Sequence, residues 1–210
     1  MDSVTYCSEI WPDQVTDGTP PDSEPVTLAE LKAWLRIDYT DEDTLLTSLI
    51  VSARREVEEY SGYRLIAQTV TARYSDWANA MVLPCPPVSA VDGVILTAAD
   101  GTVATVDPSV YVFENGKPGK LFLGYSKFWP TTILRPGLPI AINLHVGYAD
   151  AAAVPAKFKI AMMIWVQMTH FFGNKDTNST RQSQTDSYHR RLETAFNSIL
   201  GRPMPRGIAW

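Results

Sequence analysis

The chain has 210 residues, of which 45% are hydrophobic and 20% are charged, a balance typical of a globular protein with a sizeable core. Its 23 acidic and 18 basic side chains give a formal net charge of −5. This charge argues against a protein whose main task is to grip nucleic acid, because such binding depends on clustered cations that displace counterions from the phosphates.

Cysteine spacing and hydrophobic runs exclude further classes. The two cysteines, Cys7 and Cys85, form no CxxC or Cys/His pattern, so we expect no zinc site and a reduced state; a single bridge between them stays open. No apolar run reaches the roughly 18 residues that span a bilayer, so we expect no membrane contact. The acidic N-terminus lacks the charged-then-apolar pattern of a secretion signal.

The two ends of the chain carry opposite charge. Residues 1–25 contain six acids, four prolines and no Lys or Arg, and they show no hydrophobic periodicity, which predicts an extended N-terminal arm. Residues 201–210 contain two arginines, two prolines and no acid, and they predict a second arm. Such arms suit head-to-tail pairing with another copy or with a partner; two solvated termini are the alternative.

Two helices are predicted near the N-terminus. Thr27 and Glu30 have the spacing of a capping box, which starts a short helix that ends near residues 37–38. The acids at 41–43 start a second helix, and Gly62 is a suitable stop. The apolar stripe of the second helix is Leu45, Leu46, Leu49, Ile50, Ala53, Val57 and Tyr60. Its opposite face, expected in water, carries Arg54, Arg55, Glu56, Glu58 and Glu59.

The middle of the chain shows the alternation and the turn signals of short strands. Residues 68–74 are rich in Thr, Val and Tyr, and residues 140–148 alternate apolar and polar side chains. Asp100-Gly101 and the run 115–119 predict two hairpins. The proline-rich run 83–88 lacks donors for a regular ladder, so we expect it at an edge or in a crossing. These signals predict a small antiparallel β-sandwich or barrel.

Helical spacing returns after residue 150. Pro155 suits a first helical position, and Gly173 ends the predicted helix. A polar loop from 174 to about 185 precedes a last helix, which stops at Gly201. The large helical side chains Trp34, Trp165 and Phe172 are expected in the core, with a role in an interface as the alternative.

Together these patterns predict an α+β fold whose helical part is discontinuous in sequence. Residues 26–64 and 151–200 form one helical bundle, and residues 65–150 form a β-rich insertion. The extended arms, 1–25 and 201–210, lie outside both.

No constellation of side chains points to catalysis. The three histidines fit no metal-ligand spacing, and P-loop, GxSxG and GxGxxG motifs are absent. Residues 116–120 resemble a phosphate loop but lack the Ser or Thr and the helix that should follow. Asp38, Asp41 and Asp43 lack the Gly and the distal Glu of an EF-hand. We therefore expect no catalytic residue, no metal ligand and no cofactor, and a structural protein rather than an enzyme.

Several motifs follow one another in an order that resembles a known family. Residues 26–38 read VTLAELKAWLRID, and the next helix closes on SGYR at residues 61–64. Further on come LPCPPV at residues 83–88 and HVGY at residues 145–148, which leads to Val154-Pro155. In this order, over residues 26–200, the chain resembles the head–tail connector proteins of long-tailed bacteriophages, also called adaptor or head-completion proteins.

The resemblance implies a structural protein of the virion neck, with host cytoplasm as its location during assembly. Such proteins are helical bundles, some with a β insertion, and they form a ring, typically twelvefold, beneath the portal. The implied partners are further copies of the chain, the portal protein, and a stopper or tail-completion protein. The ring lines the exit channel, and DNA passes without sequence-specific binding; an acidic subunit suits this, because a cationic lumen would hold DNA.

The C-terminal arm is the predicted docking element for the portal or for the ring. Arg and Trp are favoured interface anchors, and prolines lower the entropy cost of ordering an extended arm. A frayed terminus is the alternative. The predicted contact residues are Arg202, Pro203, Met204, Pro205, Arg206, Ile208 and Trp210.

Two other functions remain open. A neighbouring neck component, such as a stopper or tail-completion protein, would have a β-dominated core with little helix. A carbohydrate- or surface-binding module would use the β-rich part of the chain, with Trp77, Trp129 and Tyr125 as stacking residues.

Overall fold

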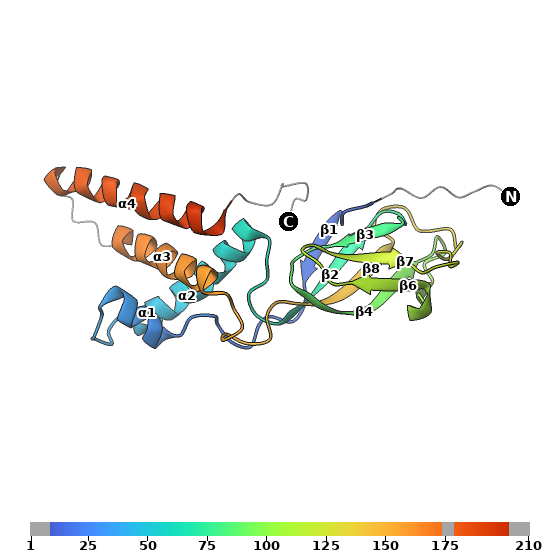
Figure 1. The fold of residues 1–210 in the computed structure, drawn as a ribbon, viewed down its shortest axis with the longest axis horizontal. Helices are drawn as coiled ribbons and strands as arrows, with labels where there is room; N and C mark the ends of the chain where they lie inside the picture. The colour runs from blue at the N-terminus through green and yellow to red at the C-terminus, as the bar shows by residue number, and fades with distance from the viewer. Residues whose placement is uncertain (1–8, 174–178, 202–210) are drawn as a thin grey trace. The chain divides into compact units, whose positions relative to one another are not determined.

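The computed structural model describes residues 9–173 and 179–201, and side chains outside 171–189 within those ranges (Figure 1). The described chain divides into two compact units. The β unit comprises residues 9–21 and 67–147, and the helical unit comprises residues 22–66 and those from 148 onward.

The helical unit contains the four α-helices of the described chain: α1 (Leu28–Leu35), α2 (Asp43–Ser61), α3 (Ala156–Gly173) and α4 (Ser179–Leu200). The predicted capping box starts α1: Thr27 Oγ1 accepts a hydrogen bond from Glu30 N (3.2 Å), and Glu30 Oε2 accepts one from Thr27 N (2.8 Å). The predicted stop of α2 is also confirmed, because Gly62 adopts φ 72° and donates its N–H to Glu58 O (2.8 Å).

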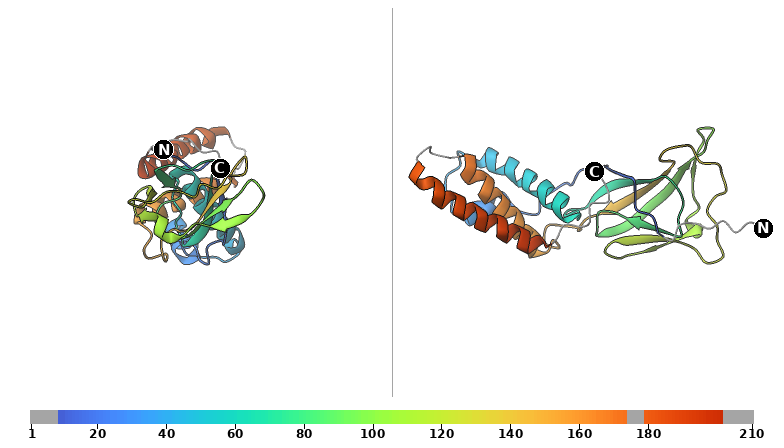
Figure 2. Two further views of the ribbon diagram at one scale, coloured as in Figure 1. Left: turned by 90° about the vertical axis from the view of Figure 1, so that its right-hand side faces the viewer. Right: turned by 90° about the horizontal axis from the view of Figure 1, so that it is seen from above.

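Buried side chains from helices at both ends of the sequence form one core in the helical unit. Leu31 of α1, Ile50 of α2, Phe158 of α3 and Phe196 of α4 all belong to it. The last two helices, α3 and α4, lie side by side in the views of Figures 1 and 2. The amphipathic stripes read from the sequence therefore meet in space, which is how most helices in globular proteins gain their stability.

Three helix-level predictions are wrong. Trp34 is 42% exposed and Leu45 is also exposed, although both were expected in the core. The reason is that each lies beside the stripe that is buried, which passes through Leu31 and Leu46 instead. The helix α4 begins at Ser179, inside the predicted loop 174–185, because residues 179–185 have adequate helix propensity but no apolar side chain to reveal a period.

The β unit holds eight strands among the described residues, with antiparallel pairing throughout the two sheets. The five-stranded sheet has the order β1-β2-β8-β4-β5, and the three-stranded sheet has the order β3-β7-β6. The coarse prediction of an α+β protein with antiparallel sheets is confirmed. The strands are β1 (Gln14–Asp17), β2 (Gln68–Tyr74), β3 (Ala80–Leu83), β4 (Val88–Thr97), β5 (Val103–Thr105), β6 (Tyr111–Glu114), β7 (Gly119–Leu123) and β8 (Ile140–Val146).

Several features of the sheets follow from local signals in the sequence. The Asp100-Gly101 turn joins β4 to β5, and the run 115–119 joins β6 to β7, so both predicted hairpins are confirmed. The strand β8 lies between β2 and β4 and buries alternate side chains, as its period predicts. Residues 84–87 carry the chain from the three-stranded sheet to the five-stranded sheet, which is the crossing expected of a proline-rich run.

The N-terminal arm is a correction. Residues 1–8 are outside the described part of the chain, but residues 10–17 pair with the β unit instead of standing free of it. Ile10 donates its N–H to Ala80 O (3.0 Å), and β1 pairs with β2 in a register that sets Val15 opposite Ala72. The edge of β2 offers unpaired backbone groups that such a strand satisfies. Pro12 and the acids hide this strand in the sequence, because a paired stretch of only four residues shows no period.

This edge strand gives the first testable prediction. Val15 packs against the β core, whereas Thr16 is exposed, so the two residues sample opposite faces of β1. Val15→Asp should lower the free energy of unfolding by about 1–3 kcal/mol, because it places a carboxylate against apolar side chains. Thr16→Asp, the matched control, should change it by less than about 0.5 kcal/mol. Urea unfolding followed by tryptophan fluorescence measures both, and equal effects would contradict packing of β1 on the core.

Candidate assembly surfaces

Titratable side chains in the described residues pair with one another and do not gather into a reactive cluster. No three His, Cys, Asp or Glu side chains in that part of the chain approach as metal ligands would. His145 Nε2 lies 2.9 Å from Asp92 Oδ1 on the exposed face of the sheet, and His170 Nε2 lies 2.8 Å from Glu42 Oε2. Cys85 is buried in the β core, and Cys7 precedes the described residues. The surfaces of the two units are therefore the places to look for function.

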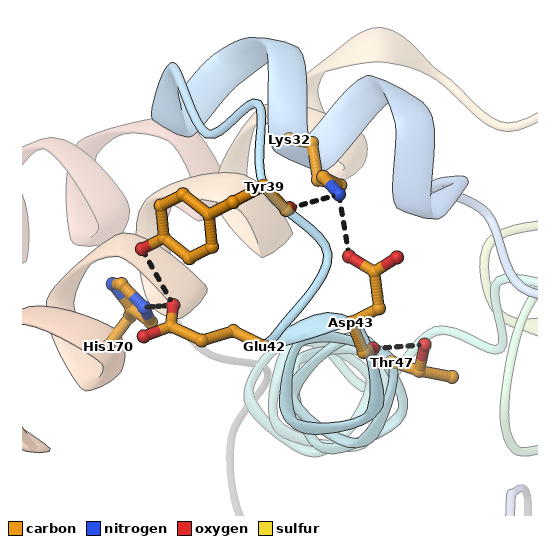
Figure 3. A network of polar contacts seen from close by, with 6 residues as sticks. All are labelled: Lys32, Tyr39, Glu42, Asp43, Thr47 and His170. Carbon is orange, nitrogen blue, oxygen red and sulfur yellow. Dashed lines mark hydrogen bonds and ion pairs between the residues drawn. The ribbon is translucent and has the colours of Figure 1, made fainter.

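The first surface is the loop that joins α1 to α2 together with the ends of both helices, residues 32–45, here called the α1–α2 corner (Figure 3). Lys32 Nζ donates to Tyr39 O (2.5 Å) and pairs with Asp43 Oδ1 (2.6 Å). Asp43 O in turn accepts a hydrogen bond from Thr47 Oγ1 (2.8 Å). One cation thus ties α1, the loop and the start of α2 together.

A carboxylate fastens the same corner to α3. Glu42 Oε2 accepts a hydrogen bond from Tyr39 Oη (3.2 Å) and lies 2.8 Å from His170 Nε2, as Figure 3 shows. The hydrogen bond with His170 holds the pKa of the Glu42 carboxyl below its ordinary value, and the bond from Tyr39 acts in the same direction. Desolvation raises the pKa of the Tyr39 hydroxyl, and the neighbouring Glu42 adds to that rise. Near neutral pH, Glu42 is therefore a carboxylate that accepts hydrogen bonds, and Tyr39 is a neutral hydroxyl that donates one.

The corner is acidic and apolar at once. Asp38 and Asp41 are exposed, and so are the large side chains of Tyr39, Leu45 and Trp34. The indole of Trp34 is held in place rather than loose, because its Nε1 donates to Gln167 Oε1 on α3 (3.0 Å).

A buried ion cluster is the largest departure from the sequence prediction in the helical unit. Arg54 and Glu58, expected on the wet face of α2, are only 6% and 4% exposed. Arg54 Nη1 lies 3.0 Å from Glu58 Oε2, and Arg54 Nε lies 2.8 Å from Glu24 Oε2. Glu58 Oε1 accepts a hydrogen bond from Leu65 N (2.8 Å). The cluster therefore binds the segments before α1 and after α2 to α2 itself. Because these segments cover the charged face of α2, side chains predicted to be exposed are buried.

Burial and partners act in opposite directions on Glu58. Burial raises the pKa of its carboxyl, while the Leu65 N–H and the Arg54 guanidinium lower it. A buried charge of this kind is tolerated only where hydrogen bonds and an opposite charge replace its water.

The second surface is the segment between β7 and β8, residues 124–139, here called the β7–β8 loop. Tyr125 is 98% exposed, Ile133 80% and Phe128 76%, the three highest values for large apolar side chains in the described chain. Trp129, between them, is 1% exposed; it stacks on Trp77 with ring centroids 4.5 Å apart and donates Nε1–H to Ala78 O (2.8 Å). The loop therefore presents apolar side chains from an anchored base.

This arrangement overturns the carbohydrate-binding hypothesis for two of its three residues. Stacking on a sugar needs an open aromatic face, and the faces of Trp77 and Trp129 are buried against each other. The predicted docking residues Arg202, Pro203, Met204, Pro205, Arg206, Ile208 and Trp210 all fall beyond residue 201, outside what the structure describes, and so remain a prediction.

Comparisons with known proteins support the resemblance expected from the sequence. Residues 25–100 match the family model described as phage gp6-like head-tail connector protein. The expected resemblance to head–tail connectors is confirmed by this match, as is the expectation of a structural protein rather than an enzyme. No curated protein gives a significant match to the sequence.

Solved structures share the fold over most of the chain. A chain from the virion of the native gene transfer agent (GTA) particle has 18% identity and a TM-score of 0.67, covering 90% of this chain and 95% of that one. A chain from the neck of the empty GTA particle, computed with C6 symmetry, has 18% identity and a TM-score of 0.66, with coverages of 79% and 88%. A chain from the neck of the native GTA particle, computed with C12 symmetry, has 16% identity and a TM-score of 0.61, with coverages of 85% and 94%.

The buried cluster gives a second prediction. Glu58→Gln replaces two acceptor oxygens by one, so either Arg54 or the Leu65 N–H loses its acceptor, and the free energy of unfolding should fall by about 1–3 kcal/mol. Glu59→Gln, at the next and exposed position, should be nearly neutral. Thermal melts of the two variants and of the parent protein compare them, and a neutral Glu58→Gln would contradict the cluster.

The α1–α2 corner gives a third prediction, on pH. Because the folded pKa of Glu42 is below its unfolded value, near 4.5, its stabilising contribution is complete above about pH 4.5 and is lost as the pH falls through the folded pKa. The stability difference between the parent protein and Glu42→Gln should therefore shrink as the pH falls below about 4.5, through the folded pKa of Glu42. Urea unfolding at a series of pH values tests this, and a difference that stays constant or grows below that pH would contradict it.

Proposed function

On the premise that residues 25–100 belong to the phage gp6-like head-tail connector family, we propose that the chain is the adaptor subunit of a neck ring. In this proposal several copies form a closed ring beneath the portal vertex, typically twelvefold. The ring joins the DNA-filled capsid to a stopper or tail-completion protein, and its inner wall forms part of the channel through which DNA leaves.

The observation that carries the proposal is the extent of the shared fold. The match to the chain from the GTA virion covers 90% of this chain, so it takes in residues of both the β unit and the helical unit. The shared fold thus extends beyond residues 25–100, which the family model matches, to most of the chain. A subunit whose counterparts occur in symmetric necks is expected to form a ring itself.

Charge supports a conduit rather than a DNA clamp. The formal net charge is −5, and a wall of that sign repels phosphate instead of exchanging counterions with it. DNA is accordingly expected to pass through the ring without sequence-specific contacts. Assembly would take place in the host cytoplasm before the subunit is fixed in the neck.

Helix content favours an adaptor over the neighbouring neck components. A stopper or tail-completion protein was expected to have a β-dominated core, whereas this chain devotes α1, α2, α3 and α4 to a core of their own. This helical core weighs against a stopper or tail-completion protein.

The proposed function is tested by assembly with the candidate portal protein. The purified chain is mixed with the purified portal ring, and the mixture is examined by negative-stain microscopy and native mass spectrometry. The proposal predicts a second ring stacked on one face of the portal, with a fixed number of copies. A chain that neither binds the portal nor forms a ring on it would contradict the proposal.

The C-terminal segment gives a fourth prediction. Removing residues 202–210 takes away both arginines and the terminal tryptophan of the predicted docking element. Portal binding should weaken by at least about tenfold, because Arg and Trp are frequent anchors of interfaces. A full-length variant with only Ala209→Ser, outside the predicted contact residues, should bind normally. Unchanged portal binding after the truncation would contradict a docking role for residues 202–210.

A further inference from the structure

The β7–β8 loop has a feature that the core of the β unit does not explain. Its three exposed apolar side chains, Tyr125, Phe128 and Ile133, lie within nine residues of sequence. Single exposed apolar residues are common on protein surfaces, but a concentration of this kind marks a surface that is covered in an assembly.

The loop is fixed to the β unit along its length, so its shape is set before any partner arrives. Ile133 O accepts a hydrogen bond from Ala99 N (2.8 Å), and Arg135 N donates to Thr97 O (3.0 Å). At the other end Gly124 N donates to Val110 O (2.8 Å). The stacked indole of Trp129 anchors the middle. A preorganised loop loses little conformational entropy when it binds, which favours a role as a docking element.

The loop is also cationic. Residues 124–139 contain Lys127 and Arg135 and no acid, a local charge of +2 in a chain of net charge −5. Outside the loop, the hydrogen bond from Ser109 N (2.8 Å) lowers the pKa of the Asp107 carboxyl, and the Lys127 ammonium adds to that lowering. A partner that fits the loop should therefore be both apolar and acidic.

The α1–α2 corner has that chemistry. Residues 32–45 contain four acids and two bases, a local charge of −2, and two of the acids, Asp38 and Asp41, are exposed. The exposed rings and side chains of Tyr39 and Leu45 stand among these acids. The network around Lys32 and Glu42 holds the corner in one conformation, so this surface is preorganised as well.

We propose that the β7–β8 loop of one copy docks on the α1–α2 corner of a second copy and that this contact joins neighbouring subunits. Lys127 and Arg135 face the carboxylates of Asp38 and Asp41, and the apolar side chains of the two surfaces cover one another. The inference rests on the proposed ring, since each subunit carries both halves of the contact and so binds one neighbour with each. Complementary charge selects this pairing over loop-to-loop or corner-to-corner contacts, which set like charges together.

The test is a charge swap between two variants of the full chain. The loop variant is Lys127→Glu/Arg135→Glu, and the corner variant is Asp38→Lys/Asp41→Lys. Each variant alone sets like charges together at every contact, so its assembly on the candidate portal should require at least about tenfold more protein than the parent chain does. An equimolar mixture restores opposite charges between unlike copies and should recover assembly, with the two variants alternating around the ring.

Controls separate a specific contact from general effects. Lys117→Glu reverses one exposed cation in the hairpin turn between β6 and β7, and it should leave assembly unchanged where Lys127→Glu weakens it. Phe128→Ser should weaken assembly, whereas Val112→Ser, an exposed position outside the loop, should not. Thermal melts confirm that each variant is folded, as expected for substitutions at exposed positions.

Recovery of assembly only in the mixture supports the proposed contact between the β7–β8 loop and the α1–α2 corner. If each variant assembles alone as well as the parent chain, or if the mixture stays as weak as its components, the contact is wrong while the proposed neck ring stands. If the loop variant loses binding to vesicles of anionic lipid while its assembly is normal, the loop serves a membrane and the contact is wrong. If the parent chain forms no ring on the portal, the proposed function and the contact fall together.

Discussion

The buried cluster of Arg54, Glu24 and Glu58 is the constraint on which the helical unit depends. The chain enters this unit just before Glu24 and leaves it just after Leu65, and both segments are bonded to the same stretch of α2. Apolar contacts there would stabilise the unit without fixing the position of the two segments. Hydrogen bonds to the Arg54 guanidinium and the Glu58 carboxylate do fix it, because they depend on direction as well as distance. The cost of desolvating the charges is offset because each is paired within the cluster.

Local signals with a strong backbone or capping requirement could be read from the sequence alone. Thr27 and Glu30 satisfy orphan N–H groups at the start of α1, Gly62 supplies the left-handed turn at the end of α2, and Asp100-Gly101 closes a hairpin. Each of these depends on a few neighbouring residues. The alternation of β8 could be predicted as well, because this central strand buries every second side chain.

Features that depend on distant segments could not be read in this way. Arg54 and Glu58 look solvated in the sequence because nothing local reveals that residues 24 and 65 cover them. The strand β1 is visible only once β2 offers an edge, and the burial of Trp77 and Trp129 is evident only once the two indoles stack. The same limit applies to function. Exposure of Phe128 and Ile133 is a tertiary property, so of the three exposed apolar side chains of the β7–β8 loop only Tyr125 was singled out from the sequence.

We propose that assembly of this ring subunit depends on two surfaces: an acidic, apolar corner on the helical unit and a cationic, apolar loop on the β unit. The proposed ring is tested most directly by a cryo-electron microscopy reconstruction of the portal assembled with this chain. The reconstruction should show a closed ring of copies beneath the portal, with the β7–β8 loop of each subunit against the α1–α2 corner of its neighbour. Density that locates the chain away from the portal, or as isolated copies without contact between them, would contradict it.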